Sequence, residues 1–187
     1  MSSIKSILLV LDLDETLVHA TRNKLNIEHD YAYADYYIYR RPYLDWFLEY
    51  ASADFRLAIW SSADDDYVQA IVERFKPEEI DFEFVWGRSR CTRRRDYDLD
   101  VYVQEKRLKK LKKQGYELSK VLIVDDSPEK TRDNYGNAIY VNSFEGDSND
   151  TELKDLANFL SQIKAVENVR SIEKRSWRSD AKAEDGT

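Results

Sequence analysis

Two pairs of carboxylates, each at the end of an apolar run, are the residues of this sequence whose type and spacing could support chemistry. Asp12 and Asp14 end the run that begins at Ile7, and Asp125 and Asp126 end a second run much later in the chain. Such short runs, bounded by charge, are typical of strands buried on both faces of a parallel sheet. Ligands bind beyond the carboxyl ends of such strands. If the two strands are neighbours, four carboxylates meet in one cleft, which favours a bound divalent cation or a raised pKa on one acid.

Taken singly, each pair has a plainer interpretation. The acids could end a strand or cap the next helix, with Pro128 forcing the turn after the second pair. The hydroxyl residues Ser61 and Ser62, which end the apolar stretch 55–60, leave the same choice open. They could donate hydrogen bonds to a phosphate oxygen beside a helix N-terminus, or serve only as the N-cap of that helix.

The elements that must position these residues follow from the alternation of apolar runs and amphipathic stretches. That alternation predicts an α/β fold with a parallel sheet. The length of 187 residues suits one domain with a substantial core. We expect the domain to cover residues 1–169. Residues 170–187 are rich in charge around the single Trp177 and are predicted to form a polar, mobile tail that does not pack.

A small insertion is predicted at residues 82–103, where two short strand-like pieces flank a basic loop. The loop contains Arg93, Arg94 and Arg95, and residues 88–113 hold 11 Lys/Arg against 4 Asp/Glu. The insertion is too small for a separate lid domain. Because arginine pairs bidentately with phosphate, the three arginines could line a groove for a phosphorylated or acidic peptide. A solvated run of charge is the equally simple alternative.

Composition excludes several classes of protein. The net charge of −7 argues against general nucleic-acid binding, and no stretch suggests a membrane span or a secretory signal. The lone Cys91 cannot form an intramolecular disulfide, which agrees with a reducing compartment. We therefore expect a monomer in the cytoplasm, or in the nucleus of a eukaryote, with no nucleic-acid or membrane partner.

The segment from Asp12 to His19, Asp-Leu-Asp-Glu-Thr-Leu-Val-His, resembles the first motif of the haloacid dehalogenase superfamily. Its branch is that of the RNA polymerase II C-terminal-domain and nuclear-LIM-interactor-like phosphatases. The resemblance runs in the correct motif order from about Ile4 to Val166. It implies a Rossmann-like parallel sheet with helices on both faces and no large cap domain.

The resemblance also implies roles for individual residues. Asp12 would be the nucleophile that becomes phosphorylated, and Asp14 the general acid and base. Ser61 takes the place of the second-motif hydroxyl residue, and Ser62 follows it. Alignment back from Gly115 puts the third-motif lysine at Lys106, although the spacing is shifted and leaves Lys109 and Lys110 open.

By the same analogy, Mg²⁺ would be held by the Asp12 carboxylate, the Asp14 backbone carbonyl and Asp126. Asp125 would be the acid that pairs with the lysine or lies outside the direct ligands. This implies a Mg²⁺-dependent phosphatase with an aspartyl-phosphate intermediate, acting on phosphoserine or phosphothreonine proteins. Three alternatives stay open: a small-metabolite phosphatase, a non-catalytic phosphoacceptor or binding module, and a signalling receiver, for which too little chain follows Asp125.

Overall fold

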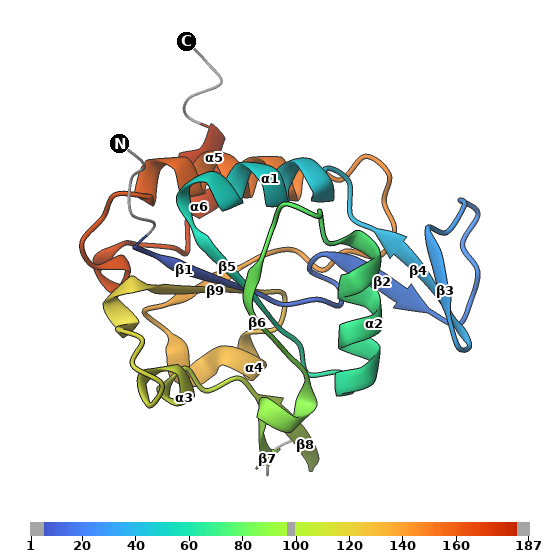
Figure 1. Cartoon of the computed structure of the whole chain (residues 1–187), viewed down its shortest axis with the longest axis horizontal. Coiled ribbons are helices and arrows are strands. Elements are labelled where there is room, and N and C mark those ends of the chain that lie inside the picture. The colour runs from blue at the N-terminus through green and yellow to red at the C-terminus, as the bar shows by residue number, and fades with distance from the viewer. Residues whose placement is uncertain (1–5, 97–99, 183–187) are drawn as a thin grey trace.

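The computed structural model describes residues 6–96 and 100–182, and it is built on a parallel sheet of five strands (Figure 1). The strand order is β10-β9-β1-β5-β6, so the two acid-tipped strands β1 and β9 are direct neighbours, which is the condition that the sequence analysis set for the two acidic pairs to meet. The strands of this sheet are β1 (Leu8–Leu11), β5 (Arg56–Trp60), β6 (Phe82–Trp86), β9 (Val121–Asp125) and β10 (Ala138–Tyr140).

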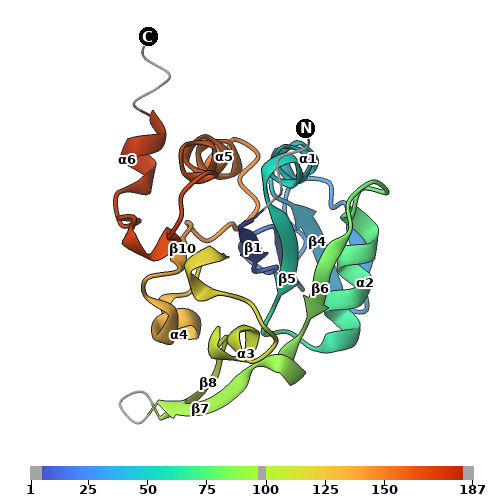
Figure 2. The same cartoon turned by 60° about the vertical axis from the view of Figure 1, so that its left-hand side comes forward.

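Helices cover both faces of the sheet, which confirms the predicted fold class (Figure 2). Alternation along β1 sends Leu9 and Leu11 into one buried cluster, and Leu8 and Val10 into another on the opposite face. The first cluster lies under α1 (Leu44–Asp54), α2 (Asp65–Phe75), α5 (Glu152–Ile163) and α6 (Trp177–Lys182). The second cluster includes Leu108 and Leu111, at α3 (Lys109–Lys112). A buried strand with an apolar residue at every position needs both covers.

Two smaller β elements flank the carboxyl edge of the sheet. An antiparallel sheet of β2 (Val18–Thr21), β4 (Tyr36–Arg40) and β3 (Tyr31–Tyr33) follows the first acidic pair and lies beside α2 (Figure 1). A hairpin of β7 (Thr92–Asp96) and β8 (Val101–Glu105) leads to Lys106. The short helix α4 (Pro128–Thr131) follows β9 directly.

The boundaries of the insertion differ from the predicted 82–103. Phe82–Trp86 is β6, the fifth strand of the main sheet, and it pairs in parallel with β5. Its mixed pattern of exposed and buried residues, typical of an edge strand, is why the sequence suggested a peripheral piece. The short 3-10 turn Arg88–Arg90 and the hairpin of β7 and β8 lie outside the sheet, and residues 97–99 lie outside the described residues.

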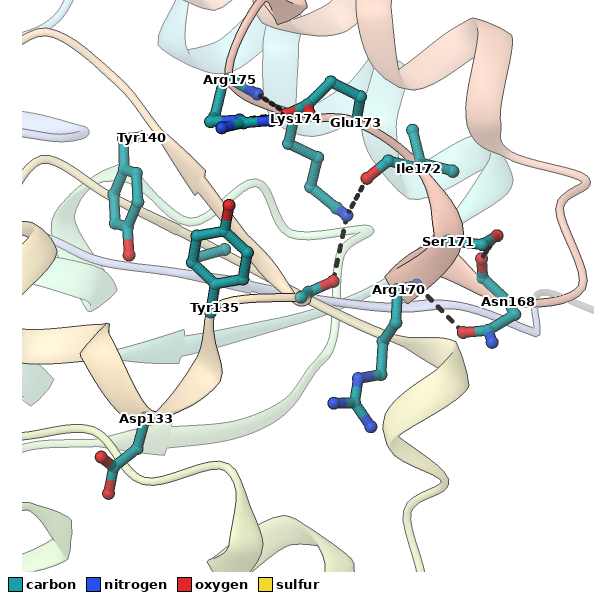
Figure 3. A pocket seen from close by; sticks show the side chains of 12 residues that line it. Asp133, Tyr135, Tyr140, Asn168, Arg170, Ser171, Ile172, Glu173, Lys174 and Arg175 are labelled. Carbon is teal, nitrogen blue, oxygen red and sulfur yellow. Dashed lines mark hydrogen bonds and ion pairs between the residues drawn. The ribbon is translucent and has the colours of Figure 1, made fainter.

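The predicted polar tail is wrong in one respect, because residues 170–182 pack on the domain. Trp177 is only 1% exposed, lies against Phe159 of α5, and donates its indole N–H to the Tyr140 carbonyl at 2.9 Å. Ahead of it, the Lys174 ammonium donates to the carbonyls of Gly136 and Ile172 (Figure 3) and to that of Val169. One buried aromatic among charges is enough to fix this segment, and periodicity could not reveal it. Residues 183–187 lie outside the described residues.

No helix within 6–96 or 100–182 is long and apolar enough to cross a membrane.

Candidate active site

The acidic pairs meet at the carboxyl ends of β1 and β9. Asp12 follows β1, and its backbone N–H donates to the Val124 carbonyl of β9 at 2.9 Å, which fixes the register of the two acidic ends. Asp12 is 1% exposed and Asp125 is fully buried. Carboxylate oxygens of Asp12, Asp125 and Asp126 lie within 4.8 Å of one another. The sheet therefore concentrates negative charge at one buried point.

Lys106 is the counter-charge to this cluster. Its buried ammonium lies 2.6 Å from Asp12 Oδ1 and 2.6 Å from Asp125 Oδ2. Burial alone would lower the pKa of Lys106, but the two carboxylates outweigh it and shift the pKa upward. The other oxygen of Asp125 accepts from the Ser127 N–H at 2.9 Å. Asp125 is therefore occupied on both oxygens.

Asp14 points away from the cluster, toward α2. Its Oδ1 accepts a 2.5 Å hydrogen bond from the Tyr67 hydroxyl, and its Oδ2 accepts from Ser61 Oγ at 3.3 Å. Burial raises the pKa of Asp14 to about 6, with the charge of Asp12 adding to the shift and the hydroxyl of Tyr67 opposing it. A carboxyl group with such a pKa can exchange a proton near neutral pH. Ser61 in turn accepts from the Ala63 N–H at 3.0 Å.

The donor set suits a small, hard divalent cation. Asp12 Oδ2 is buried and accepts no hydrogen bond from the described residues. It faces Asp126, whose Oδ1 accepts only from the hydroxyl of Ser127 among those residues. A buried carboxylate oxygen without a donor is costly unless a cation or a substrate meets it. Two carboxylates and solvent are the ligands that Mg²⁺ prefers, so the residues fit this ion.

Comparison with known proteins agrees with this arrangement. Residues 7–170 match the family model described as NLI interacting factor-like phosphatase. The chain belongs to this family.

Curated relatives of this phosphatase family include the human protein "Carboxy-terminal domain RNA polymerase II polypeptide A small phosphatase 1". It is 30% identical over 173 residues, which cover 89% of this chain and 62% of the relative. "Nuclear envelope morphology protein 1" of Schizosaccharomyces pombe is 28% identical over 174 residues, covering 88% of this chain and 34% of the relative. The chain thus spans about a third to two thirds of the length of these relatives.

A solved structure shows the same fold. The fission yeast RNA polymerase II CTD phosphatase Fcp1-R271A bound to beryllium fluoride superposes with a TM-score of 0.57 at 19% sequence identity. The match covers 95% of this chain and 49% of that chain.

Within this phosphatase fold, the sequence reasoning placed most candidates together. The structure brings Asp12, Lys106, Asp125 and Asp126 into one cluster, with Asp14 and Ser61 hydrogen bonded beside it. Of the other two lysines, Lys109 is exposed, and the Lys110 ammonium donates to the carbonyls of Arg90 and Cys91, away from the cluster.

Ser62 is brought less close to the cluster. It is half-buried, and its backbone carbonyl accepts from Arg88 at 3.0 Å. No side-chain hydrogen bond of Ser62 occurs among the described residues.

The three arginines of the hairpin already have partners within the chain. The Arg93 guanidinium stacks on the Tyr102 ring at 3.8 Å. Arg94 lies 3.2 Å from Glu105, and Arg95 lies 2.5 Å from Asp100. These contacts orient the side chains of the three arginines.

Three residues of the site escaped the sequence analysis. Tyr67 contacts Asp14 across 53 positions of the chain, a separation that no local pattern reveals. Burial raises the pKa of Glu15 to about 8, with the charges of Asp14 and Asp126 adding to the shift. Lys130 lies 3.9 Å from Asp12 Oδ2 and 3.9 Å from Asp126 Oδ1. Its place four residues after Asp126 was the one available signal, because that spacing puts side chains on the same face of a helix.

Two cavities lie near the carboxyl edge. One of about 340 Å³ opens beside Asp14 and is lined by Tyr33, Tyr36, Tyr67 and Arg88 among others. Another of about 620 Å³ lies between the segments 133–140 and 168–175 (Figure 3) and contains none of the acidic cluster. Only the first cavity is in contact with the site.

Proposed function

We propose that this protein is a Mg²⁺-dependent phosphatase that hydrolyses phosphate monoesters through an aspartyl-phosphate intermediate on Asp12. The observation that carries the proposal is the unequal treatment of the two Asp12 oxygens. Oδ1 accepts from Leu13 N–H at 2.8 Å and from Lys106, whereas Oδ2 is buried and accepts no hydrogen bond from the part of the chain that the structure describes. A carboxylate held on one side and free on the other is arranged to attack an electrophile.

In the first half-reaction, Asp12 attacks phosphorus and the bond from phosphorus to the ester oxygen breaks. Asp14 gives its proton to the leaving oxygen. Its pKa of about 6 leaves part of the Asp14 population protonated at neutral pH. In the second half-reaction the Asp14 carboxylate takes a proton from water, which attacks phosphorus and releases Asp12 and inorganic phosphate.

Charge on the phosphoryl oxygens is balanced by Lys106, the Ser61 hydroxyl and the amides that follow β5. The Asp12 and Asp126 carboxylates, with the Asp14 backbone carbonyl, would hold Mg²⁺. The ion would supply Lewis-acid stabilisation of the transferred group. The buried pairing of Asp125 with Lys106 at 2.6 Å keeps that lysine in place, and it supports Asp125 as a positioning residue rather than a ligand.

A phosphoserine or phosphothreonine protein is the substrate that the cleft favours. Two β elements of the described residues flank the mouth, the hairpin of β7 and β8 and the sheet of β2, β4 and β3, and both are too small to close over a cleft as a cap domain would. The 340 Å³ cavity beside Asp14 could accept a residue next to the phosphorylated one. The name of the human relative refers to RNA polymerase II, which is a protein. By analogy with that relative, the partner of this chain is proposed to be a phosphorylated protein.

The proposed enzyme acts as a monomer inside the cell. All site residues come from one chain, so a second copy is not needed to complete the site. The name of the Schizosaccharomyces pombe relative refers to the nuclear envelope, which supports an intracellular place for this chain.

The decisive experiment measures hydrolysis of an aryl phosphate by the wild type and by Asp12→Asn, with Mg²⁺ and with EDTA. We expect a loss of at least about 10⁴-fold in the variant, because a neutral amide cannot be phosphorylated in place of the nucleophile. EDTA should have a comparable effect on the wild type. A folded wild type that shows no turnover would favour the phosphoacceptor or binding module.

The proposed groove has its own test. Replacing Arg93, Arg94 and Arg95 together by Ala should raise KM for a phosphopeptide by about 10-fold and leave KM for a small aryl phosphate unchanged. Equal effects on both substrates would show that the hairpin does not receive peptide. Higher kcat/KM for small phosphorylated metabolites than for phosphopeptides would favour the small-metabolite phosphatase.

A further inference from the structure

Lys130 is a second lysine in the cleft, and the family motifs do not account for it. It lies on α4, and its backbone carbonyl accepts from the Lys106 N–H at 2.7 Å, so the two lysine-bearing segments are tied together. Its ammonium lies 3.9 Å from Asp12 Oδ2 and 3.9 Å from Asp126 Oδ1. It therefore approaches the oxygen of Asp12 that Lys106 leaves free.

Lys106 and Lys130 differ in whether their ammonium groups can still donate hydrogen bonds to a ligand. The Lys106 side chain is 0% exposed, and both of its carboxylate partners lie at 2.6 Å. The Lys130 side chain is 22% exposed, and at 3.9 Å both of its partners are beyond hydrogen-bond distance. An ammonium group has three N–H donors. Lys130 is held near Asp12 by charge, with its donors available to a group that enters the cleft.

The negative charge of the cleft indicates a function for Lys130. The carboxylates of Asp12, Asp125 and Asp126 gather where a phosphate dianion must arrive, and Lys106 neutralises only part of their charge. In a near-attack geometry, phosphorus lies about 3–3.5 Å from the attacking oxygen. An ammonium group 3.9 Å from that oxygen is then within reach of the phosphoryl oxygens.

We propose that Lys130 is a further catalytic residue of this site, which binds an oxygen of the transferred phosphoryl group beside Asp12. The inference rests on the proposed phosphatase function. It adds a second lysine to the one that the family motif supplies. Lys106 balances phosphoryl charge while it is tied to Asp12 and Asp125 at 2.6 Å, whereas Lys130 reaches the phosphoryl group from α4.

A rival explanation makes a different prediction. If Lys130 only balances Asp12 and Asp126 where a cation would otherwise lie, its removal strengthens Mg²⁺ binding and leaves phosphate binding unchanged. If it binds the phosphoryl group, its removal weakens phosphate binding even when Mg²⁺ is saturating. The two effects fall on different ligands and are separately measurable.

The test compares the wild type with Lys130→Met, which keeps the length of the side chain and removes its charge, and with Lys130→Arg. Lys112→Met, on the exposed surface of α3, is the matched control. Calorimetric titrations would measure the dissociation constants of Mg²⁺ alone and of inorganic phosphate at saturating Mg²⁺. Thermal unfolding in EDTA would check that each variant is folded.

We expect Lys130→Met to weaken phosphate binding and lower kcat/KM for an aryl phosphate, each by about 10- to 100-fold, with partial recovery in Lys130→Arg. Lys112→Met should match the wild type. A folded Lys130→Met protein with an unchanged phosphate dissociation constant would overturn the inference, whether or not its Mg²⁺ binding is tighter.

The outcome separates this inference from the proposed function. If the wild type hydrolyses the aryl phosphate and the Lys130→Met variant is equally active, only the proposed role of Lys130 is overturned. A wild type that binds phosphate through Lys130 but never hydrolyses an ester overturns the phosphatase and keeps the phosphate site. A wild type that neither binds phosphate nor turns over rejects both.

Discussion

Lys106 and Lys174 are both buried lysines, and the contrast between their surroundings separates the cleft from the C-terminal segment 168–182. The ammonium of Lys106 contacts two carboxylates. That of Lys174 donates to the neutral carbonyls of Gly136, Val169 and Ile172, at 3.0, 2.6 and 2.9 Å. The pKa of Lys106 is therefore raised, whereas burial lowers the pKa of Lys174.

The difference shows which of the two regions stabilises the fold. The C-terminal segment surrounds the Lys174 ammonium with neutral carbonyls and buries Trp177, so these contacts favour folding. In the cleft, acids are gathered that repel one another, and Asp12 Oδ2 accepts no hydrogen bond from any described residue. We therefore expect substitutions in the cleft to reduce activity without loss of stability. Substitutions in the segment 168–182 should reduce stability before they reduce activity.

Among the substitutions that test this contrast between the two regions, Asp126→Asn should have the largest effect. We expect kcat/KM for an aryl phosphate to fall about 10³-fold, or roughly 4 kcal/mol in activation free energy, because one of two acidic ligands of the cation is lost. Stability in EDTA should stay equal or rise, since the amide keeps an acceptor for the Ser127 hydroxyl and removes one repelling charge.

Urea unfolding and steady-state kinetics would check both halves of that prediction. Asp35→Asn, an exposed carboxylate in the turn before β4, is the matched control and should change neither. A loss of stability large enough to account for the lost activity would break the contrast between the two regions.

Trp177→Ala should reduce stability and leave activity unchanged, the opposite of Asp126→Asn. Removal of this side chain leaves a cavity against Phe159 and takes one donor from the Tyr140 carbonyl, which also accepts from Arg178 at 3.1 Å. We expect the free energy of unfolding to fall by about 3 kcal/mol, with kcat of the folded fraction unchanged. The exposed Trp46, which stacks on Tyr50, gives a control whose replacement by Ala should cost about 1 kcal/mol or less. Equal losses at both positions would mean that the segment does not stabilise the domain.

The sequence was sufficient for features that depend on one strand and its end. Apolar runs through residues 7–11 and 121–124 predicted two buried strands, because a strand buried on both faces is apolar at nearly every position. That the two strands are neighbours comes from the structure. The acids at their ends could then be placed without knowing the helices. Lys106 was placed through the family resemblance, since four other lysines follow it within seven residues.

What sequence could not supply are contacts between elements that are far apart in the chain. Arg41 lies buried against Asp150, 109 positions later, although each residue alone looks like surface charge. Trp177 was read as part of a polar tail because its neighbours are charged, and its burial depends on the shape of the groove beside α5. Tyr67 belongs to the same class, and its hydroxyl gives the last and smallest prediction.

Tyr67→Phe keeps the ring, which packs edge-on against Tyr33 at 5.4 Å, and removes the hydroxyl that donates to Asp14. That hydrogen bond favours the charged carboxylate and so holds the pKa of Asp14 down against burial. Without it, the pKa should rise above about 6. Asp14 would then remain protonated to higher pH. The pH at which kcat/KM declines on the alkaline side should therefore shift to a higher value.

The accompanying loss in kcat/KM near neutral pH should be about 10-fold or less, close to 1 kcal/mol, because one neutral donor is removed from a carboxyl that Ser61 still contacts. Profiles from pH 5 to pH 9 with an aryl phosphate would measure the shift. Tyr33→Phe is the control, since Tyr33 lines the same cavity but donates no hydrogen bond to Asp14. If the limb stays in place in Tyr67→Phe, the titration of Asp14 does not set it. The assignment of Asp14 as the acid would then lose its support from the pH profile.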